Sequence, residues 1–260
     1  MTEPRLRIEG VSRAFDSGNV IHDIDLDIRR GEFVSIVGPS GSGKSTLFNI
    51  VSGLIKPTAG KVLLDGRDIT GERGHVGYML QKDLLLPWRS VVGNIVLGAA
   101  LRRKVTREDR QRAAELATKY GLGEYLNHYP WALSGGMRQR VAFMRTLALQ
   151  ADLLLLDEPF GALDAQTRLE MQMWLLSIFE ELNATILFIT HDVDEAIFLS
   201  DRVVVFTGRP GSIAADIAID TPRPRGLDVL TTPDFVERKR RALALLHQND
   251  YVAHGGLTTS

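Results

Sequence analysis

Apolar and polar residues alternate in two segments near the N-terminus. Residues 5–15 (RLRIEGVSRAF) and 20–28 (VIHDIDLDI) both have the period of two that is typical of a strand with one buried face. Residues 31–38 (GEFVSIVG) form a continuous β-branched run that ends in glycine, which indicates a strand buried on both faces. Residues 61–69 (KVLLDGRDI) predict a further strand and a turn. The first part of the chain is therefore expected to be largely β-structure.

Helical patterns with charged faces occupy the middle of the chain, from about Asp83 to Met137, for example in residues 106–122 (TREDRQRAAELATKYGL). Buried-strand patterns return in residues 151–159 (ADLLLLDEP), 184–192 (ATILFITHD) and 202–208 (RVVVFTG), with helical segments between them. Strands that alternate with helices predict a mostly parallel sheet covered on both faces.

These patterns predict an α/β fold with three parts. Residues 1–82 and 138–220 are expected to form a core with a mostly parallel sheet and an N-terminal antiparallel β part. The helical stretch, about residues 83–137, is expected to be an insertion that forms its own α-helical subdomain. Residues 221–260 are polar and predict a C-terminal helical tail.

Composition narrows the class of protein. Lys and Arg total 31 against 32 acidic residues, so the net charge of −1 provides no basic field to attract nucleic acid. The absence of cysteine excludes disulfides, thiolate metal sites and cysteine nucleophiles. The N-terminus lacks the pattern of a signal peptide, and no apolar run approaches the ~20 residues of a membrane helix. We therefore expect a cytosolic protein that does not bind nucleic acid.

Residues 38–46 (GPSGSGKST) match the phosphate-binding pattern G-x-x-x-x-G-K-[ST]. The motif follows a predicted buried strand and precedes a predicted helix, so that curled backbone N–H groups and the helix dipole face phosphate oxygens. Lys44 is expected to reach the β- and γ-phosphates, and the Ser45 hydroxyl to hold Mg²⁺. The expected nucleotide-binding residues here are Gly38, Pro39, Ser40, Gly41, Ser42, Gly43, Lys44, Ser45 and Thr46.

Residues 153–159 (LLLLDEP) place two acids after a strongly apolar run. The leucines predict a buried strand that delivers Asp157 at its C-terminal end, where it faces Mg²⁺ directly or through water. Glu158 follows and is the natural general base, because its carboxylate can polarise the water that attacks the γ-phosphate. Combined with the phosphate loop, this pair predicts a P-loop enzyme, a class that includes kinases, GTPases and motors.

Further motifs decide the class of this enzyme. They are YMLQ ending at Gln81, LSGGMRQR at residues 133–140, GALD ending at Asp164, and LFITHD carrying His191. In this order they resemble the ATP-binding subunits of ABC transporters, and the resemblance extends from Phe15 to about Gly211. It implies an ABC ATPase domain over residues 1–220 that binds ATP and Mg²⁺.

The resemblance implies a role for several single residues. Phe15 would stack on adenine, although a core phenylalanine is the alternative. Gln81 would ligate Mg²⁺ and sense the γ-phosphate. Asp164 would belong to a loop that communicates between two ATP sites. His191 would hydrogen-bond the γ-phosphate and position the attacking water.

Ser134, Gly135 and Gly136 would cap the γ-phosphate of ATP held by the phosphate loop of a second ATPase subunit, for which an identical copy is the simplest partner. Two chains would then meet head to tail, and ATP binding would become association of the two. The alternative, that these residues only cap a helix, explains neither the second glycine nor the arginine-rich segment behind it.

Residues 82–95 (KDLLLPWRSVVGNI) carry an apolar cluster that either packs the helical subdomain or contacts a membrane partner. Large aromatics anchor such contacts, so we expect Trp88 to face permease subunits. Two positions depart from the family pattern. Met137 stands where glutamine is usual, and Gly93 stands where many relatives have an acid.

The flanking sequences look like the importer branch that serves nitrate, sulfonate, taurine, bicarbonate and a thiamine precursor. This branch implies permease subunits, a substrate-binding protein, and a peripheral position on the cytoplasmic face of the inner membrane. The alternatives are a non-transport ABC ATPase and a mechanotransmitting ABC complex.

Overall fold

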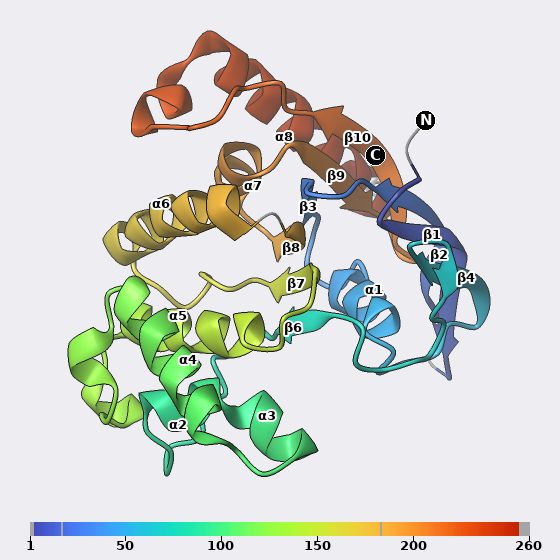
Figure 1. Ribbon diagram of the computed structural model, residues 1–260. Helices are drawn as coiled ribbons and strands as arrows, with labels where there is room; N and C mark the ends of the chain where they lie inside the picture. The colour runs from blue at the N-terminus through green and yellow to red at the C-terminus, as the bar shows by residue number, and fades with distance from the viewer. Residues whose placement is uncertain (1–2, 17, 183, 255–260) are drawn as a thin grey trace. The chain divides into compact units, whose positions relative to one another are not determined.

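The computed structural model describes residues 3–16, 18–182 and 184–254 (Figure 1). Its internal contacts divide the chain into two units. The first, called the sheet unit, comprises Met1–His75 and Leu175–Ser260, and the second, called the helical unit, comprises Val76–Trp174.

The sheet unit contains a four-stranded antiparallel sheet with the strand order β2-β1-β4-β5. Its strands are β1 Leu6–Phe15, β2 Gly18–Ile28, β4 Ala59–Leu64 and β5 Arg67–Asp68. In the second half of β2 buried and exposed residues alternate, as the sequence pattern predicts for a strand with one buried face. The predicted antiparallel β part is therefore confirmed.

A second group of strands in this unit has β3 Phe33–Val37 between β8 Thr185–Thr190 and β9 Arg202–Thr207, and both neighbours are parallel to it. Every residue of β3 and β8 is buried, which is why both are predominantly apolar in sequence. The strand β10 Ser212–Ala218 pairs antiparallel with β9 and was not predicted. Only Ile217 is buried in β10, so its apolar pattern is weak.

The helices of the sheet unit include α1 Lys44–Val51, α7 Val193–Leu199 and α8 Pro233–His254. A short 3₁₀ turn, η3 Leu227–Thr231, precedes α8. Helix α7 packs on the parallel strands, and α8 lies against α7, β9 and β10 (Figure 1). Helix α8 lies in the predicted tail segment, and the last six tail residues, 255–260, lie outside the described residues. Helix α6 Ala165–Leu182 is shared by the two units.

The helical unit contains one parallel strand pair, β6 Gly77–Met79 and β7 Leu153–Asp157. Its helices include α2 Val91–Ile95, α3 Leu97–Arg102, α4 Arg107–Lys119 and α5 Gly135–Leu147, with 3₁₀ turns η1 Gly123–Tyr125 and η2 Pro130–Ala132. Helices α2, α4 and α5 pack on one another. The strand β6 was not predicted, because three residues are too few to show a period.

The parallel strands, the antiparallel part and the predominantly helical second unit confirm the predicted α/β fold class. Over the residues that are described, every helix is too short or too polar to span a bilayer.

Candidate nucleotide-binding and catalytic site

The phosphate loop, residues 38–46, joins the end of β3 to the start of α1. Gly43 is the N-cap of α1 with φ 87°, a left-handed conformation that favours glycine. An added Cβ at Gly43 would overlap the Ile21 side chain, and one at Gly38 would lie 2.7 Å from the Phe206 carbonyl oxygen. Local backbone geometry and close packing therefore both require glycine in this loop.

The Lys44 side chain is buried inside the curl of the loop, where Nζ donates to the carbonyl oxygens of Gly38 (2.8 Å) and Pro39 (2.9 Å). This places an ammonium group where phosphate oxygens are expected. Exposure differs along the motif: Pro39, Ser40, Gly41 and Ser45 are exposed, Thr46 is partly exposed, and Gly38, Ser42 and Gly43 are buried.

Arg209 is a cation at the phosphate loop that the sequence motifs did not indicate. Its Nη2 donates to the Ser40 carbonyl oxygen at 2.9 Å, and an ideal Cβ at Gly41 would lie 2.7 Å from the same nitrogen. The contact joins positions 169 residues apart, between the phosphate loop and the β9–β10 connection. A local motif has no signal for a contact of this range.

His191 directly follows β8, and the phosphate loop follows β3. The two strands are parallel neighbours, with Val37 in register with Thr190. The carboxyl ends of both strands therefore lie at the same edge, which brings the start of the phosphate loop and the exposed His191 to one side of the sheet unit.

Phe15 lies at the end of β1 and is 39% exposed, so it is not a core phenylalanine. The Arg13 guanidinium lies over one face of its ring, 4.4 Å from the ring centroid, and also donates to the Lys56 carbonyl oxygen at 3.0 Å. An arginine on one face leaves the opposite face as the surface on which adenine is predicted to stack.

In the helical unit, the ends of β6 and β7 bring Gln81 and the acidic pair together, with Met79 in register with Leu156. Gln81 Nε2 donates to Glu158 Oε2 at 3.0 Å. Glu158 has φ 44°, an uncommon backbone conformation for a residue with a side chain and one that clusters at functional sites. The loop after β7 therefore holds Glu158 in a specific orientation.

Asp157 is buried, and the Tyr78 hydroxyl donates to its Oδ2 at 3.2 Å. Burial, followed by the nearby Asp157 charge, raises the pKa of Tyr78, so the phenol stays protonated and remains a donor. The carboxylate of Asp157 is thus oriented by a neighbour that the motifs did not identify.

The side chains predicted to bind Mg²⁺ are suited to an ion that is also bound by the phosphates of the nucleotide. Within the described part of the chain, no group of three His, Cys, Asp or Glu side chains could hold a metal alone. Magnesium commonly takes one or two protein oxygens and completes its shell with phosphate and water. The predicted donors are the Ser45 hydroxyl in the sheet unit, and Gln81 and Asp157 in the helical unit.

Ser134 is the N-cap of α5, and its Oγ accepts a hydrogen bond from the Met137 amide at 3.3 Å. Close packing explains the glycine at position 136, because an added Cβ would lie 2.9 Å from Cγ2 of Thr167. Arg138 bonds Asp83 and the Leu133 carbonyl. Helix capping and packing therefore account for the second glycine and part of the arginine-rich segment, contrary to the expectation from sequence.

The capping role does not compete with phosphate binding. Ser134 is exposed, and its hydroxyl accepts from Met137, which leaves its proton free to be donated to an anion. Asp164 likewise caps a helix, since its Oδ1 accepts from the Thr167 amide at 3.0 Å, and this bond lowers the pKa of Asp164. Both side chains are exposed at helix starts.

The two departures from the family pattern share one structural position. Gly93 and Met137 are each the third residue of a helix whose N-cap is a serine, Ser90 for α2 and Ser134 for α5. An acid or glutamine at this position bonds back to the N-cap amide and completes a capping box. Both helices here keep the serine half of the box and lack the reciprocal half.

Known proteins are similar to this chain over most of its length. A family model described as ABC transporter matches residues 21–161. The aliphatic sulfonates import ATP-binding protein SsuB 1 of Rhodococcus jostii is 47% identical, over 85% of this chain and 85% of that protein. The taurine import ATP-binding protein TauB of Rhizobium johnstonii is 40% identical, over 90% of this chain and 92% of that protein.

A solved structure described as a dimeric post-hydrolysis state of the ATP-binding cassette MJ0796 with ADP and Pi matches with a TM-score of 0.72. The two sequences are 31% identical, and the match covers 84% of this chain and 100% of the solved chain. The chain therefore belongs to the ABC transporter family, and it is an ATP-binding ATPase of that family. The predicted resemblance to the importer branch is confirmed, and an importer subunit is favoured over a non-transport ABC ATPase.

Proposed function

We propose that this chain binds and hydrolyses ATP with Mg²⁺ to power a membrane importer for a small solute of the sulfonate, taurine or nitrate type. The observation that carries the proposal is that two separate helix starts have the glycines and hydroxyls suited to phosphate binding, the loop at residues 38–46 before α1 and the exposed Ser134 before α5. One chain with one nucleotide needs only the first of them. The second is explained when two chains meet head to tail around two ATP molecules.

Each side chain has a defined chemical part in this proposal. Lys44 neutralises charge on the β- and γ-phosphates, and Ser45, Gln81 and Asp157 supply oxygens to Mg²⁺. Glu158 accepts a proton from the attacking water, which His191 orients against the γ-phosphorus.

If Ser134 contacts the ATP held by the phosphate loop of a partner subunit, Ser134→Arg should have a selective effect. A large cation at the dimer contact is expected to abolish ATP-dependent dimerisation, while ATP binding to the single chain stays within about twofold of the unchanged protein, because the phosphate loop is untouched. Light scattering with and without ATP, together with equilibrium nucleotide binding, measures the two effects separately.

Ser90→Arg is the matched control, because Ser90 is also a helix N-cap whose side chain accepts a backbone N–H. Replacing Ser90 removes a helix cap and is expected to lower the free energy of unfolding by ~1 kcal/mol. Dimerisation with ATP is nevertheless expected to persist. If folded Ser134→Arg lost ATP binding as well, Ser134 would act on its own chain's nucleotide.

We propose that the permease docks on the loop at residues 83–90. Leu84 is 52% exposed and Trp88 is 71% exposed, whereas Leu85 is buried, so the cluster divides into a contact surface and a core anchor. The side chain of buried Asn94 bonds the Leu86 amide (2.8 Å) and the Arg89 carbonyl (3.0 Å). A loop held in this way presents apolar side chains without a large ordering cost.

A hollow of about 490 Å³ lies in the helical unit among residues of α3, α4 and the end of α5. Val96, Ala99, Leu147 and Leu149 give it apolar walls, and basic and acidic side chains also line it, among them Arg102, Asp109 and Glu115. A hollow of this size could receive apolar side chains of a docking helix, so we place it within the same contact surface.

Purification of the full chain from its native membranes in mild detergent tests the importer proposal. We expect a multi-span permease to co-purify, with or without a substrate-binding protein, and the position to be the cytoplasmic face of the inner membrane. Trp88→Glu is expected to lose the permease. Trp131→Glu, at 70% exposure against 71% for Trp88, is expected to retain it. Co-purification of ribosomal or DNA-bound proteins without a permease would assign the ATPase to another machine.

A further inference from the structure

The helix α7 is the element that directly follows His191. Its seven residues, Val193–Leu199, begin after the N-cap Asp192, whose Oδ1 accepts from the amides of Asp194 (2.9 Å) and Glu195 (3.2 Å). A helix of about two turns has little stability of its own, so its position depends on what packs against it. Whatever holds α7 also holds the backbone on which His191 sits.

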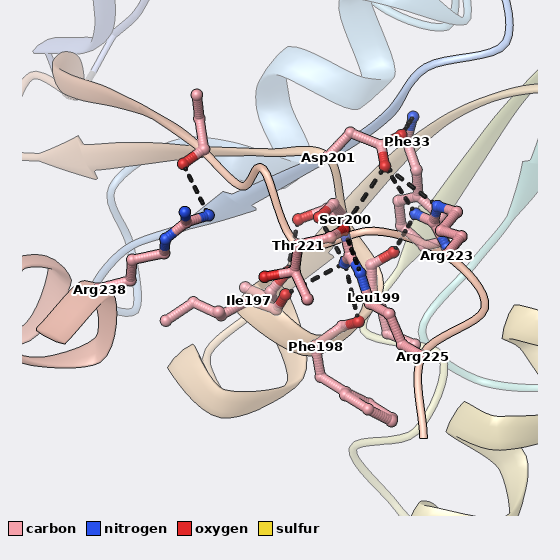
Figure 2. A network of polar contacts seen from close by, with 12 residues as sticks. Phe33, Ile197, Phe198, Leu199, Ser200, Asp201, Thr221, Arg223, Arg225 and Arg238 are labelled. Carbon is pink, nitrogen blue, oxygen red and sulfur yellow. Dashed lines mark hydrogen bonds and ion pairs between the residues drawn. The ribbon is translucent and has the colours of Figure 1, made fainter. Parts of the chain in front are cut away.

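The C-terminal end of α7 is held by a buried arginine from the tail (Figure 2). Arg225 has a side chain only 1% exposed, and its Nη1 donates to the carbonyl oxygens of Ile197 (3.3 Å), Phe198 (3.0 Å) and Ser200 (2.8 Å). Carbonyls of this kind have no partner within a helix. Its Nε and Nη2 also donate to the Thr221 carbonyl at 3.2 and 2.9 Å.

Burying a guanidinium is costly unless its donors are satisfied, and here all three nitrogens have carbonyl partners. Burial, followed by repulsion from Arg223, lowers the pKa of Arg225 to about 10. The group therefore stays charged at neutral pH and can serve as a permanent cap.

A second tail arginine joins the same end of α7 to strand β3. Arg223 Nη2 donates to the Leu199 carbonyl (2.6 Å) and to Asp201 Oδ1 (2.9 Å), while Asp201 Oδ2 accepts from the Phe33 amide (2.9 Å) (Figure 2). The strand that begins at Phe33 leads to the phosphate loop. The tail thus fixes α7 relative to the strand that carries the nucleotide-binding motif.

The N-terminal end of α7 is held by the tail helix α8. Lys239 Nζ lies 2.7 Å from Oδ2 of Asp194, three residues after His191. The helix that presents Lys239 is itself anchored, because Phe235 and Ala242 are buried. By contrast Arg240, the next residue of α8, forms an ion pair with Glu237 on its own helix, and both side chains are exposed.

We propose that the tail from Thr221 through α8 is a positioning element for His191, with Arg225 and Lys239 as its positioning residues at the two ends of α7. Neither residue belongs to the predicted nucleotide-binding set, and the inference rests on the proposed role of His191 in orienting the attacking water. Loosening the tail should therefore slow the chemical step and leave ATP affinity unchanged.

The test uses Lys239→Met in the full chain, because removing the buried Arg225 could unfold the protein. A partly exposed ion pair contributes little, so kcat is expected to fall about two- to fivefold with an unchanged Kd for ATP. Arg240→Met, the control on the same helix, should match the unchanged protein. The charge exchange Asp194→Lys with Lys239→Asp should recover part of the loss.

The deciding measurement repeats Lys239→Met in a His191→Ala background, by single-turnover ATP hydrolysis. If the tail acts through His191, Lys239→Met has no further effect there, and an undiminished additional loss would overturn the proposal. If His191→Ala is slow but Lys239→Met alone is unaffected, only the tail proposal fails. If His191→Ala keeps full turnover, the role of His191 fails and the tail proposal with it.

Discussion

Replacing Glu158 with glutamine is expected to lower the rate of ATP hydrolysis at least about a hundredfold, because an amide cannot accept the proton of the attacking water. The substitution conserves size, and a glutamine oxygen can still accept the 3.0 Å hydrogen bond from Gln81. The geometry of the loop after β7 should therefore persist. ATP binding should persist too, so that the ATP-bound dimer accumulates.

Steady-state phosphate release and light scattering with ATP measure these two effects. Glu170→Gln is a suitable control, because Glu170 is an exposed acid of α6 whose Oε1 accepts from Gln166 on the same helix at 3.2 Å. It should leave both quantities unchanged. Full hydrolysis by the Glu158→Gln protein would remove Glu158 as the base and direct attention to His191.

Replacing Lys44 with alanine is expected to weaken ATP binding about 10- to 150-fold. A hydrogen bond to a charged group contributes roughly 1.5–3 kcal/mol, and every 1.4 kcal/mol is about tenfold in Kd. The substitution also removes the two bonds from Nζ to the Gly38 and Pro39 carbonyls, so the empty loop itself loses an internal contact.

Equilibrium titration with ATP measures the affinity, and thermal unfolding without nucleotide reports the loss of the internal contact. Lys61→Ala, at an exposed position of β4, removes the same charge from a surface site and should change neither quantity. An unchanged Kd for ATP in Lys44→Ala would contradict the role of this loop as the phosphate cradle.

Some strands can be predicted from the sequence of their own segment, and others cannot. Strands β3 and β8 are buried along their whole length, so most of their residues are apolar and the strands can be predicted from the segment alone. Strand β10 has one buried residue, so its sequence shows little alternation of apolar and polar positions. It is recognised as a strand through its pairing with β9. Strand β6, with three residues, is recognisable only beside β7.

For the motif at residues 133–140, the sequence again predicted one role and the structure added another. The order S-G-G before a helical segment predicted a phosphate contact, and the structure adds that Ser134 caps α5 and that Gly136 faces Thr167. Both roles use the same atoms, so the sequence pattern could not separate them. The role toward a partner's nucleotide stays a prediction that Ser134→Arg tests.

The sequence by itself determined the fold class, the phosphate loop and the acidic pair, because these depend on residues close together in the chain: a buried run, a glycine turn, a lysine and two acids at fixed spacing. Only the tertiary structure placed Arg209 at Ser40, Arg13 on Phe15, and Arg225 and Lys239 at the two ends of α7. Arginine and lysine are common on any surface, and their spacing in the chain has no relation to the distant carbonyl, ring or carboxylate that they contact. The packing of the strands and helices decides which cations are buried and what they hold.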